Sequence, residues 1–314
     1  MTRRTRAAEA VTRALGSPLV ERGLRPAWRR GVRVLALHGV ADVAAFEALV
    51  THLAEHYRPV AGEEVLAARA GASLPPGAVW LTFDDGHPSV VEDGLPVLQR
   101  HGVPATLYVC PGLVEAGEPG WWDVVLAAGE EGTGAEVEGT RRCGPALVRA
   151  LKAVPDEERR RVVDEVRGSG GRARPVASEA QLERWVEAGM ELGNHTWDHP
   201  LLHRSPPEHQ VAQVARAHDW LLERWGPAAV ATAAYPNGDH TPTAEQALRD
   251  RGYRAGLLFD HRIARLDRRP LRTSRLRLDA DADMGRVRAV VGGAHPAAFH
   301  AGARLAALAG GRVA

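Results

Sequence analysis

The feature that most constrains the fold is the alternation of short apolar runs with longer amphipathic segments along most of the chain. Seven runs are rich in β-branched, aromatic or apolar residues, and several of the segments between them repeat apolar residues at helical spacing. Strands that alternate with helices predict a parallel sheet covered by its crossover helices. We therefore predict an α/β fold with strands at residues 31–38, 79–83, 105–110, 190–193, 230–235, 254–259 and 271–278.

The predicted helices occupy residues 42–56, 89–101, 179–188, 206–225, 241–251 and 297–308. Ser178 is expected to cap one of them, because a serine hydroxyl accepts hydrogen bonds from the first free amides of a helix. The pattern changes between residues 112 and 177, where Gly- and Glu-rich sequence precedes a charged amphipathic stretch at 145–166. We interpret residues 112–177 as an insertion over the mouth of the fold.

Length and composition bound the organisation and the partners. A chain of 314 residues with 45% hydrophobic content can form one large domain, placed here at residues 31–314. The formal net charge of +1 argues against nucleic-acid binding through a broad basic face. No run reaches the roughly 18 apolar residues of a membrane span. Two cysteines are too few for a disulfide scaffold, and Cys110 is expected to be buried in a strand.

Residues 1–30 contain eight arginines and two glutamates. The arginines interrupt every apolar run, so the segment does not read as a signal peptide. We predict a solvated basic N-terminal arm, with a basic helix lying on a membrane or partner as the alternative. The expected location is cytoplasmic, with contact to a membrane surface as the alternative.

Two adjacent carboxylates, Asp84 and Asp85, follow the strand at 79–83. Side chains alternate along a strand, so neighbouring aspartates at its end can take different roles, one binding metal and one handling protons. The other interpretation is a local turn, in which Gly86 takes a positive φ and the aspartates bond to nearby backbone.

Two histidines, His195 and His199, follow the strand at 190–193. Their spacing would let both imidazoles face one point on a helical turn that ends at Pro200. Imidazole is the commonest metal ligand, and two histidines with one carboxylate leave an open position on zinc. Alone, the pair fits two partly exposed loop histidines better. Together, the two motifs favour a metal site because both follow strands, where α/β barrels place their chemistry.

These residues resemble the polysaccharide deacetylases, the NodB-homology group of metal-dependent carbohydrate esterases, over about residues 32–293. Thr82 to Gly86 (T-F-D-D-G) is similar to the first motif of that family, and His195 to His199 (H-T-x-x-H) to the second. Residues 234–238 resemble the third motif in its Tyr-Pro-Asn-Gly form. The resemblance implies a distorted (β/α)7 TIM-like barrel with a helical insertion. It also implies a hydrolase that removes N-acetyl groups from amino sugars of a polysaccharide or glycan precursor.

The resemblance further implies a role for each matching residue. Asp85, His195 and His199 would bind a divalent metal, most simply zinc, with cobalt, nickel or iron as alternatives. Asp84 would be the general base, and the backbone N–H of Asn237 would stabilise the oxyanion. One branch of the family is circularly permuted, and Leu35 to His38 resembles its first strand, which makes His38 the expected general acid. The motif arginine that orients the base is replaced by Ala234, and Arg275 is the expected substitute.

Substrate contacts and competing functions stay open on sequence alone. Trp121 and Trp122 are expected either to stack on a sugar or to anchor the insertion, and Tyr235 is expected at the mouth. His87 and Asp198 are candidates for fixing a ligand tautomer. The expected substrate is an N-acetylated glycan or a lipid-linked sugar. The alternatives are a deformylase or amidase acting on a small non-glycan amide, and a non-catalytic carbohydrate-binding protein. The sequence does not set the oligomeric state.

Overall fold

The computed structural model describes residues 15–29, 31–168, 172–266 and 269–301. Its central sheet is parallel and has the strand order β10-β1-β3-β4-β7-β8-β9, with β2 paired to β3. All seven strands expected from the sequence are present. The strands are β1 (Arg33–Leu37), β2 (Arg58–Pro59), β3 (Ala78–Phe83), β4 (Ala105–Val109), β7 (Glu191–Asn194), β8 (Thr232–Ala234), β9 (Ala255–Leu257) and β10 (Leu276–Arg277).

The sheet curls into a distorted barrel. A parallel bridge joins Leu257 at the end of β9 to Thr273, which lies three residues before β10. The strands read as continuous apolar runs because both faces are covered: β1 and β3 are buried along their whole length. Alternate side chains divide between two clusters. Leu35 and Leu81 pack in the large cluster with residues of the outer helices, whereas Val34 and Trp80 pack in a smaller second cluster.

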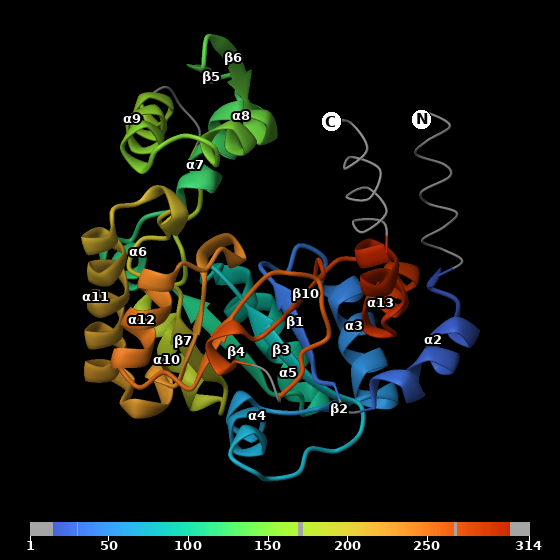
Figure 1. Ribbon diagram of the computed structural model, residues 1–314. Helices are drawn as coiled ribbons and strands as arrows, with labels where there is room; N and C mark the ends of the chain where they lie inside the picture. Colours follow the sequence, from blue (N-terminus) through green and yellow to red (C-terminus); the bar gives the residue numbers. More distant parts are fainter. Residues whose placement is uncertain (1–14, 30, 169–171, 267–268, 302–314) are drawn as a thin grey trace, which may run out of the picture.

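The helices cover the outside of this sheet (Figure 1). Side-chain caps begin several of them: Asp42 accepts from the Ala45 N–H, and Ser178 forms the expected cap with Gln181. The predicted helix at 89–101 begins with a π-helical turn, η2 (Val90–Gly94). Residues 294–301 are helical, and the rest of the predicted 297–308 helix lies outside the described residues. The covering helices are α3 (Val43–His56), α4 (Gly62–Arg69), α5 (Leu95–His101), α6 (Pro111–Ala116), α10 (Glu179–Glu187), α11 (Pro207–Trp225), α12 (Pro242–Asp250) and α13 (Met284–Val291).

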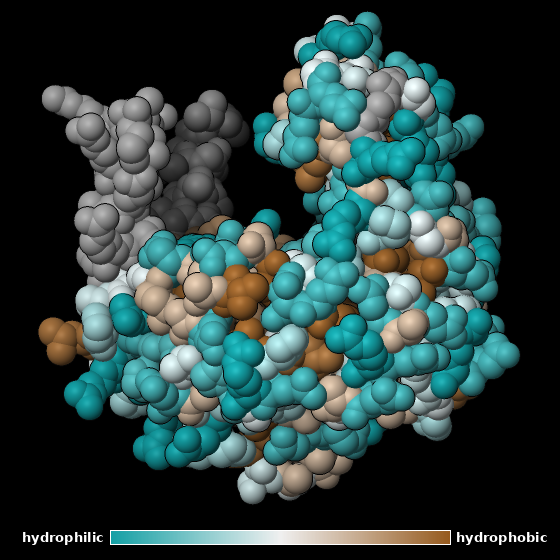
Figure 2. All heavy atoms as spheres, turned by 180° about the vertical axis from the view of Figure 1, so that it is seen from behind, coloured by the Kyte–Doolittle hydropathy of each residue, from teal (hydrophilic) through white to brown (hydrophobic). Residues whose placement is uncertain are grey.

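The insertion forms a lobe that projects beyond the barrel in Figures 1 and 2. It contains α7 (Trp121–Glu130), an antiparallel hairpin of β5 (Gly134–Val137) and β6 (Thr140–Cys143), α8 (Gly144–Leu151) and α9 (Asp156–Arg167). The single amphipathic stretch expected at 145–166 is therefore two helices. Leu147, Leu151 and Val162 belong to a hydrophobic cluster separate from the barrel core, so the lobe has a core of its own.

The expectation of a solvated N-terminal arm is wrong for residues 15–29; residues 1–14 lie outside the described residues. Helix α2 (Pro18–Leu24) leads into the 3-10 turn η1 (Arg25–Trp28). Glu21 is only 2% exposed, and its Oε1 accepts from Tyr57 Oη at 2.6 Å and lies 2.9 Å from His52 Nε2. The arm docks because one acidic side chain among arginines finds buried polar partners on α3 and just after it.

Two further sequence expectations concern exposure and membranes. Cys110 is buried as expected, and both cysteines are free thiols. Within the described part of the chain, no helix combines the length and apolarity needed to cross a membrane. On the face shown in Figure 2, hydrophobic side chains form small groups between hydrophilic ones.

Candidate active site

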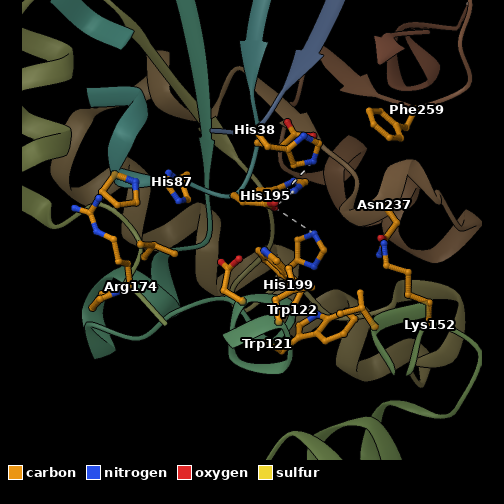
Figure 3. A pocket seen from close by; sticks show the side chains of 18 of the residues that line it. His38, His87, Trp121, Trp122, Lys152, Arg174, His195, His199, Asn237 and Phe259 are labelled. Atoms are coloured by element: carbon orange, nitrogen blue, oxygen red, sulfur yellow. Dashed lines mark ion pairs between the residues drawn. The ribbon is translucent and has the colours of Figure 1, made fainter. Parts of the chain in front are cut away.

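The carboxyl ends of the parallel strands meet beneath the insertion and form a cavity of about 330 Å³, called here the rim cavity. His38 follows β1, Asp84 and Asp85 follow β3, and His195 follows β7, so parallel pairing alone brings these side chains to one edge. Figure 3 shows His38, His195 and His199 pointing toward a common centre. The sequence motifs that lie far apart in the chain thus converge as expected.

Asp85, His195 and His199 form the only cluster of metal-ligand side chains among the described residues, with their ligand atoms all within 4.8 Å of one another. Asp85 Oδ1 lies 3.2 Å from His195 Nε2 and 3.5 Å from His199 Nε2. Asp85 has a φ of 70°, a left-handed conformation that non-glycine residues adopt only when the surroundings hold it. This backbone geometry directs the two neighbouring aspartates to different partners.

The hydrogen bonding around the cluster fits a divalent cation. His195 Nδ1 lies 2.8 Å from the carbonyl oxygen of Ala234, which can only accept, so Nδ1 carries a proton and, in the neutral imidazole, Nε2 keeps its lone pair. Asp85 Oδ1 is buried and has no hydrogen-bond partner. A lone pair and a carboxylate that face each other at 3.2 Å call for a cation between them. Tetrahedral zinc, with bonds of about 2.0–2.1 Å, holds ligand atoms roughly 3.3 Å apart, which matches this spacing.

The histidine motif is not a helical turn, and that expectation is wrong. Residues 195–200 form a loop with positive φ at Thr196 (66°) and His199 (58°). Asn194 Oδ1 accepts from the Thr196 N–H at 2.7 Å. Gln213 Oε1, from α11, accepts from the amides of residues 197 and 198 at 3.0 and 3.1 Å. Side chains satisfy the loop amides that a helix would bond internally, so the loop can hold both imidazoles against Asp85.

Asp84 forms a bidentate ion pair with Arg275. The two guanidinium nitrogens Nη1 and Nη2 each donate to one carboxylate oxygen at 2.7 Å, and Arg275 is 0% exposed. Arg275 Nε donates to the Leu258 carbonyl oxygen at 2.8 Å, and Nη1 also donates to Thr82 Oγ1 at 3.1 Å. Burial alone would raise the pKa of Asp84, but the charge and hydrogen bonds of Arg275, together with the charges of His195 and His38, outweigh it and hold the pKa below its usual value. Arg275 thus contacts Asp84 where Ala234 cannot.

Two further predicted residues line the rim cavity. His38 Nε2 lies 3.8 Å from Asp85 Oδ2, and its side chain is 41% exposed. Asn237 has a φ of 55°, and its Nδ2 is buried without a hydrogen-bond partner. Both residues are therefore placed to meet a molecule bound over the Asp85–His195–His199 cluster.

The candidates for fixing a ligand tautomer have other partners. Ser89 Oγ hydrogen-bonds to His87 Nδ1 at 2.7 Å, and Asp198 is paired with Arg160 at 3.1 Å. The Ala234 carbonyl, rather than His87 or Asp198, contacts His195 Nδ1, so neither candidate fixes the tautomer of His195. A backbone acceptor leaves no signal in the sequence.

The aromatic residues divide between two roles. Trp122 lies against His199, with ring centroids 4.5 Å apart, and lines the rim cavity. Trp121 also reaches the cavity wall but is 6% exposed, packs in the core of the insertion and lies under the Arg159 guanidinium. Trp121 therefore anchors the insertion. Tyr235 is 2% exposed and donates its hydroxyl to the Leu271 carbonyl oxygen, so the expectation that it lines the mouth is wrong.

Sequence reasoning missed four charged residues that line the rim cavity: Asp123, Lys152, Arg174 and Arg277. The first three belong to residues 112–177, where neither spacing nor motif indicates which side chains turn toward the barrel. Burial, assisted by the charge of Asp85, raises the pKa of Asp123 to about 7. Burial lowers the pKa of His199 to about 3, so its imidazole is neutral, the form that binds metal.

The curled parallel sheet and the site define an α/β barrel with a carboxylate and two histidines at its rim that could hold a metal ion. The family model for polysaccharide deacetylase matches residues 71–256. The chain belongs to the polysaccharide deacetylase family, hydrolases that cleave amide carbon–nitrogen bonds to remove N-acetyl groups from polysaccharides and depend on a metal. The match includes both aspartates and both histidines but not His38 or Arg275, so the circular permutation stays a prediction.

Solved structures share the fold. IcaB from Ammonifex degensii is 21% identical with a TM-score of 0.57 and covers 84% of this chain and 97% of its own. The deacetylase PplD of Streptococcus pyogenes, in complex with acetate, is 20% identical with a TM-score of 0.53, covering 82% and 95%. The BpsB deacetylase domain from Bordetella bronchiseptica is 18% identical with a TM-score of 0.54, covering 80% and 96%. No curated protein matches the chain.

Proposed function

We propose that this chain deacetylates an N-acetylated glycan or lipid-linked sugar with zinc held by Asp85, His195 and His199 and with Asp84 as general base. The observation that carries the proposal is the bidentate Asp84–Arg275 pair beside the three ligand side chains. An ionised carboxylate next to a metal centre, held by a guanidinium rather than by the metal, is arranged to accept a proton.

The chain supplies the proton transfers. When bound, zinc acidifies water and polarises the amide carbonyl. Asp84 keeps lone pairs beyond those that Arg275 occupies, so it can take the proton of the attacking water. Arg275 keeps Asp84 ionised and oriented. His38, near Asp85 and open to the cavity, donates a proton to the departing amine, which otherwise leaves poorly.

The remaining contacts stabilise the oxyanion and the sugar. The backbone N–H of Asn237 is the proposed oxyanion donor, in a turn whose positive φ fixes its direction. Trp122 supplies an aromatic surface for a sugar ring. The Asp84–Arg275 pair also argues against a non-catalytic protein, because the cation that Ala234 cannot provide is supplied by Arg275, the residue before β10.

The test is acetate release from a panel of N-acetylated oligosaccharides and lipid-linked sugars, with zinc-loaded protein. We expect D84N to lower turnover by about 10²–10⁴-fold while it still binds zinc, because it removes a general base and no ligand. D164N, which changes an exposed aspartate of α9, is the matched control and is expected to keep full turnover. Full turnover by D84N would refute the assignment of the base.

A further inference from the structure

The basic residues of this chain are almost all arginine. Of 40 lysines and arginines, 39 are arginine, and the single lysine is Lys152. That lysine lines the rim cavity. A lysine ammonium is a compact point charge on a flexible stem, whereas arginine presents a planar fork that is always charged. The only lysine of the chain therefore lies in the cavity where we propose that the reaction takes place.

Lys152 reaches the cavity from the insertion. It is the C-cap residue of α8, and Figure 3 shows its side chain extending toward Asn237, on the other side of the ligand histidines from Arg174. Its side chain has no ion pair or hydrogen bond to any described residue. Lys152 is an exposed residue, and the partial desolvation of its ammonium group lowers its pKa. The charge of Asp85 raises this pKa, Arg277 lowers it and Asp239 raises it.

The other charges of the cavity are largely compensated. Asp84 is paired with Arg275, and Arg174 is paired with Glu92 at 3.0 Å. Arg277 is the exception on the cationic side: its Nε is 3.9 Å from Asp279, with both side chains more than half exposed, a geometry that contributes little.

Lys152 and Arg277 both line the rim cavity, and the charge of Arg277 acts on Lys152. Arg277 lies over the Phe259 ring at 5.6 Å, which holds its guanidinium beside the mouth. Asp123 is the remaining cavity carboxylate, and its raised pKa leaves it only partly charged near pH 7. An incoming anion would relieve the repulsion between Lys152 and Arg277.

We propose that Lys152 and Arg277 form a subsite for an anionic group, a carboxylate or a phosphate, carried by the substrate next to its acetamido sugar. The inference rests on the proposed function and narrows it to acidic glycans or sugar phosphates. The insertion would then contribute to substrate specificity, because Lys152 lies on the insertion and Arg277 lies on the barrel rim.

The kinetic test compares matched substrates. One is a neutral N-acetylglucosamine disaccharide, the second pairs N-acetylglucosamine with a hexuronic acid, and the third is N-acetylglucosamine 1-phosphate. We expect K152M to lower the ratio of kcat/KM for an anionic substrate to that for the neutral one about tenfold, mainly through KM, because a charged hydrogen bond is lost. K152R should retain most of this ratio. R149M, which removes an exposed charge from the same helix, should leave it unchanged.

The three substrates separate the two sources of negative charge. A ratio that falls only for the hexuronate assigns the subsite to carboxylates, and one that falls only for the phosphate assigns it to phosphates. If K152M leaves the wild-type ratio unchanged for both anionic substrates, the inference is overturned. An equal loss of kcat/KM on all three substrates also overturns it, because Lys152 would then act on the acetamide that they share.

A second measurement does not depend on turnover. Lys152 carries the only ε-amine of the chain, so reductive methylation followed by mass spectrometry reports its accessibility, with the α-amino group as internal reference. We expect glucuronate or glucose 1-phosphate to slow methylation of Lys152 at least fivefold, and glucose to have no effect. R277M should weaken this protection. Equal rates with all three additives would contradict an anion subsite.

The two measurements also separate the inference from the function on which it rests. Acetate release without anion selectivity or protection would remove the subsite and leave the deacetylase. Protection by anions without acetate release from any substrate would remove the proposed function.

Discussion

At the scale of single residues, the site shows two adjacent aspartates with different partners. Asp84 faces a buried guanidinium, and Asp85 faces two imidazoles. Burial would raise the pKa of each carboxyl, and in each case the neighbouring groups outweigh it and lower the pKa. The surroundings of the two aspartates thus give them different proposed roles. For Asp84, the deciding neighbour is Arg275.

Removing the Arg275 charge should raise the pKa of Asp84, because the largest of the effects that lower it is lost while the effect of burial remains. We expect R275M to lower kcat/KM at neutral pH and to move the acidic limb of the pH profile to higher pH. Breaking a buried pair also costs about 3–5 kcal/mol of stability. The double variant D84N/R275M should recover part of that loss, which chemical denaturation would measure. An acidic limb that stays in place in R275M would contradict the role given to Arg275.

Gln213 offers a second test at this scale, because it holds the loop that carries His199. We expect Q213A to weaken zinc binding about 10–100-fold, the range typical of residues that support metal ligands. Q210A is the matched control, since Gln210 is a buried glutamine of the same helix that bonds to Ser205 instead. Competition titration with a chelating dye measures both. Equal zinc affinities in the two variants would show that the loop needs no support from α11.

At the scale of elements, strands were predictable and loops were not. The continuous apolar runs indicated β1, β3 and β4 because strands buried on both faces need apolar side chains throughout. The loop after β7 was misread as a helical turn because its positive φ angles are stabilised by Gln213, a residue on another helix. Helix α2 was missed for a similar reason, since its partners His52 and Tyr57 lie about 30 residues away.

The docking of α2 gives a prediction with a defined pH dependence. Burial would raise the pKa of Glu21, but bonds to His52 and Tyr57 outweigh it and lower the pKa from 4.5 to about 2. Glu21 therefore contributes stability that is fully present above pH 4.5 and is lost as the pH falls toward 2. We expect E21Q to lower the free energy of unfolding by about 3 kcal/mol at pH 7.

The difference between wild type and E21Q should shrink below pH 4.5 and vanish near pH 2, as urea denaturation at several pH values would show. E55Q changes an exposed glutamate of α3 and should match wild type at every pH. If the difference in unfolding free energy between E21Q and wild type stays constant from pH 7 to pH 2, Glu21 stabilises the fold through packing rather than through its charge.

At the scale of the whole molecule, a barrel rim supplies the three proposed metal ligands and an insertion lies over them (Figure 1). The motifs predicted the rim because parallel strands bring their carboxyl ends together whatever their distance in sequence. Trp122, Asp123 and Lys152 come from the insertion, and only Trp122 was expected at the cavity. The orientation of side chains in a lobe with its own core depends on packing that no local pattern records. The residues that could carry out the reaction were therefore easier to predict from the sequence than the residues that could select the substrate.

The central claim is that Asp85, His195 and His199 together hold one divalent metal ion. Metal content after reconstitution with zinc and removal of excess metal tests it directly, by elemental analysis of wild type and D85A. The account predicts one zinc per wild-type chain, and less than about a tenth of that in D85A, because one of three protein ligands is lost. A wild-type chain that retains no zinc, or a D85A chain that retains as much as wild type, would contradict it.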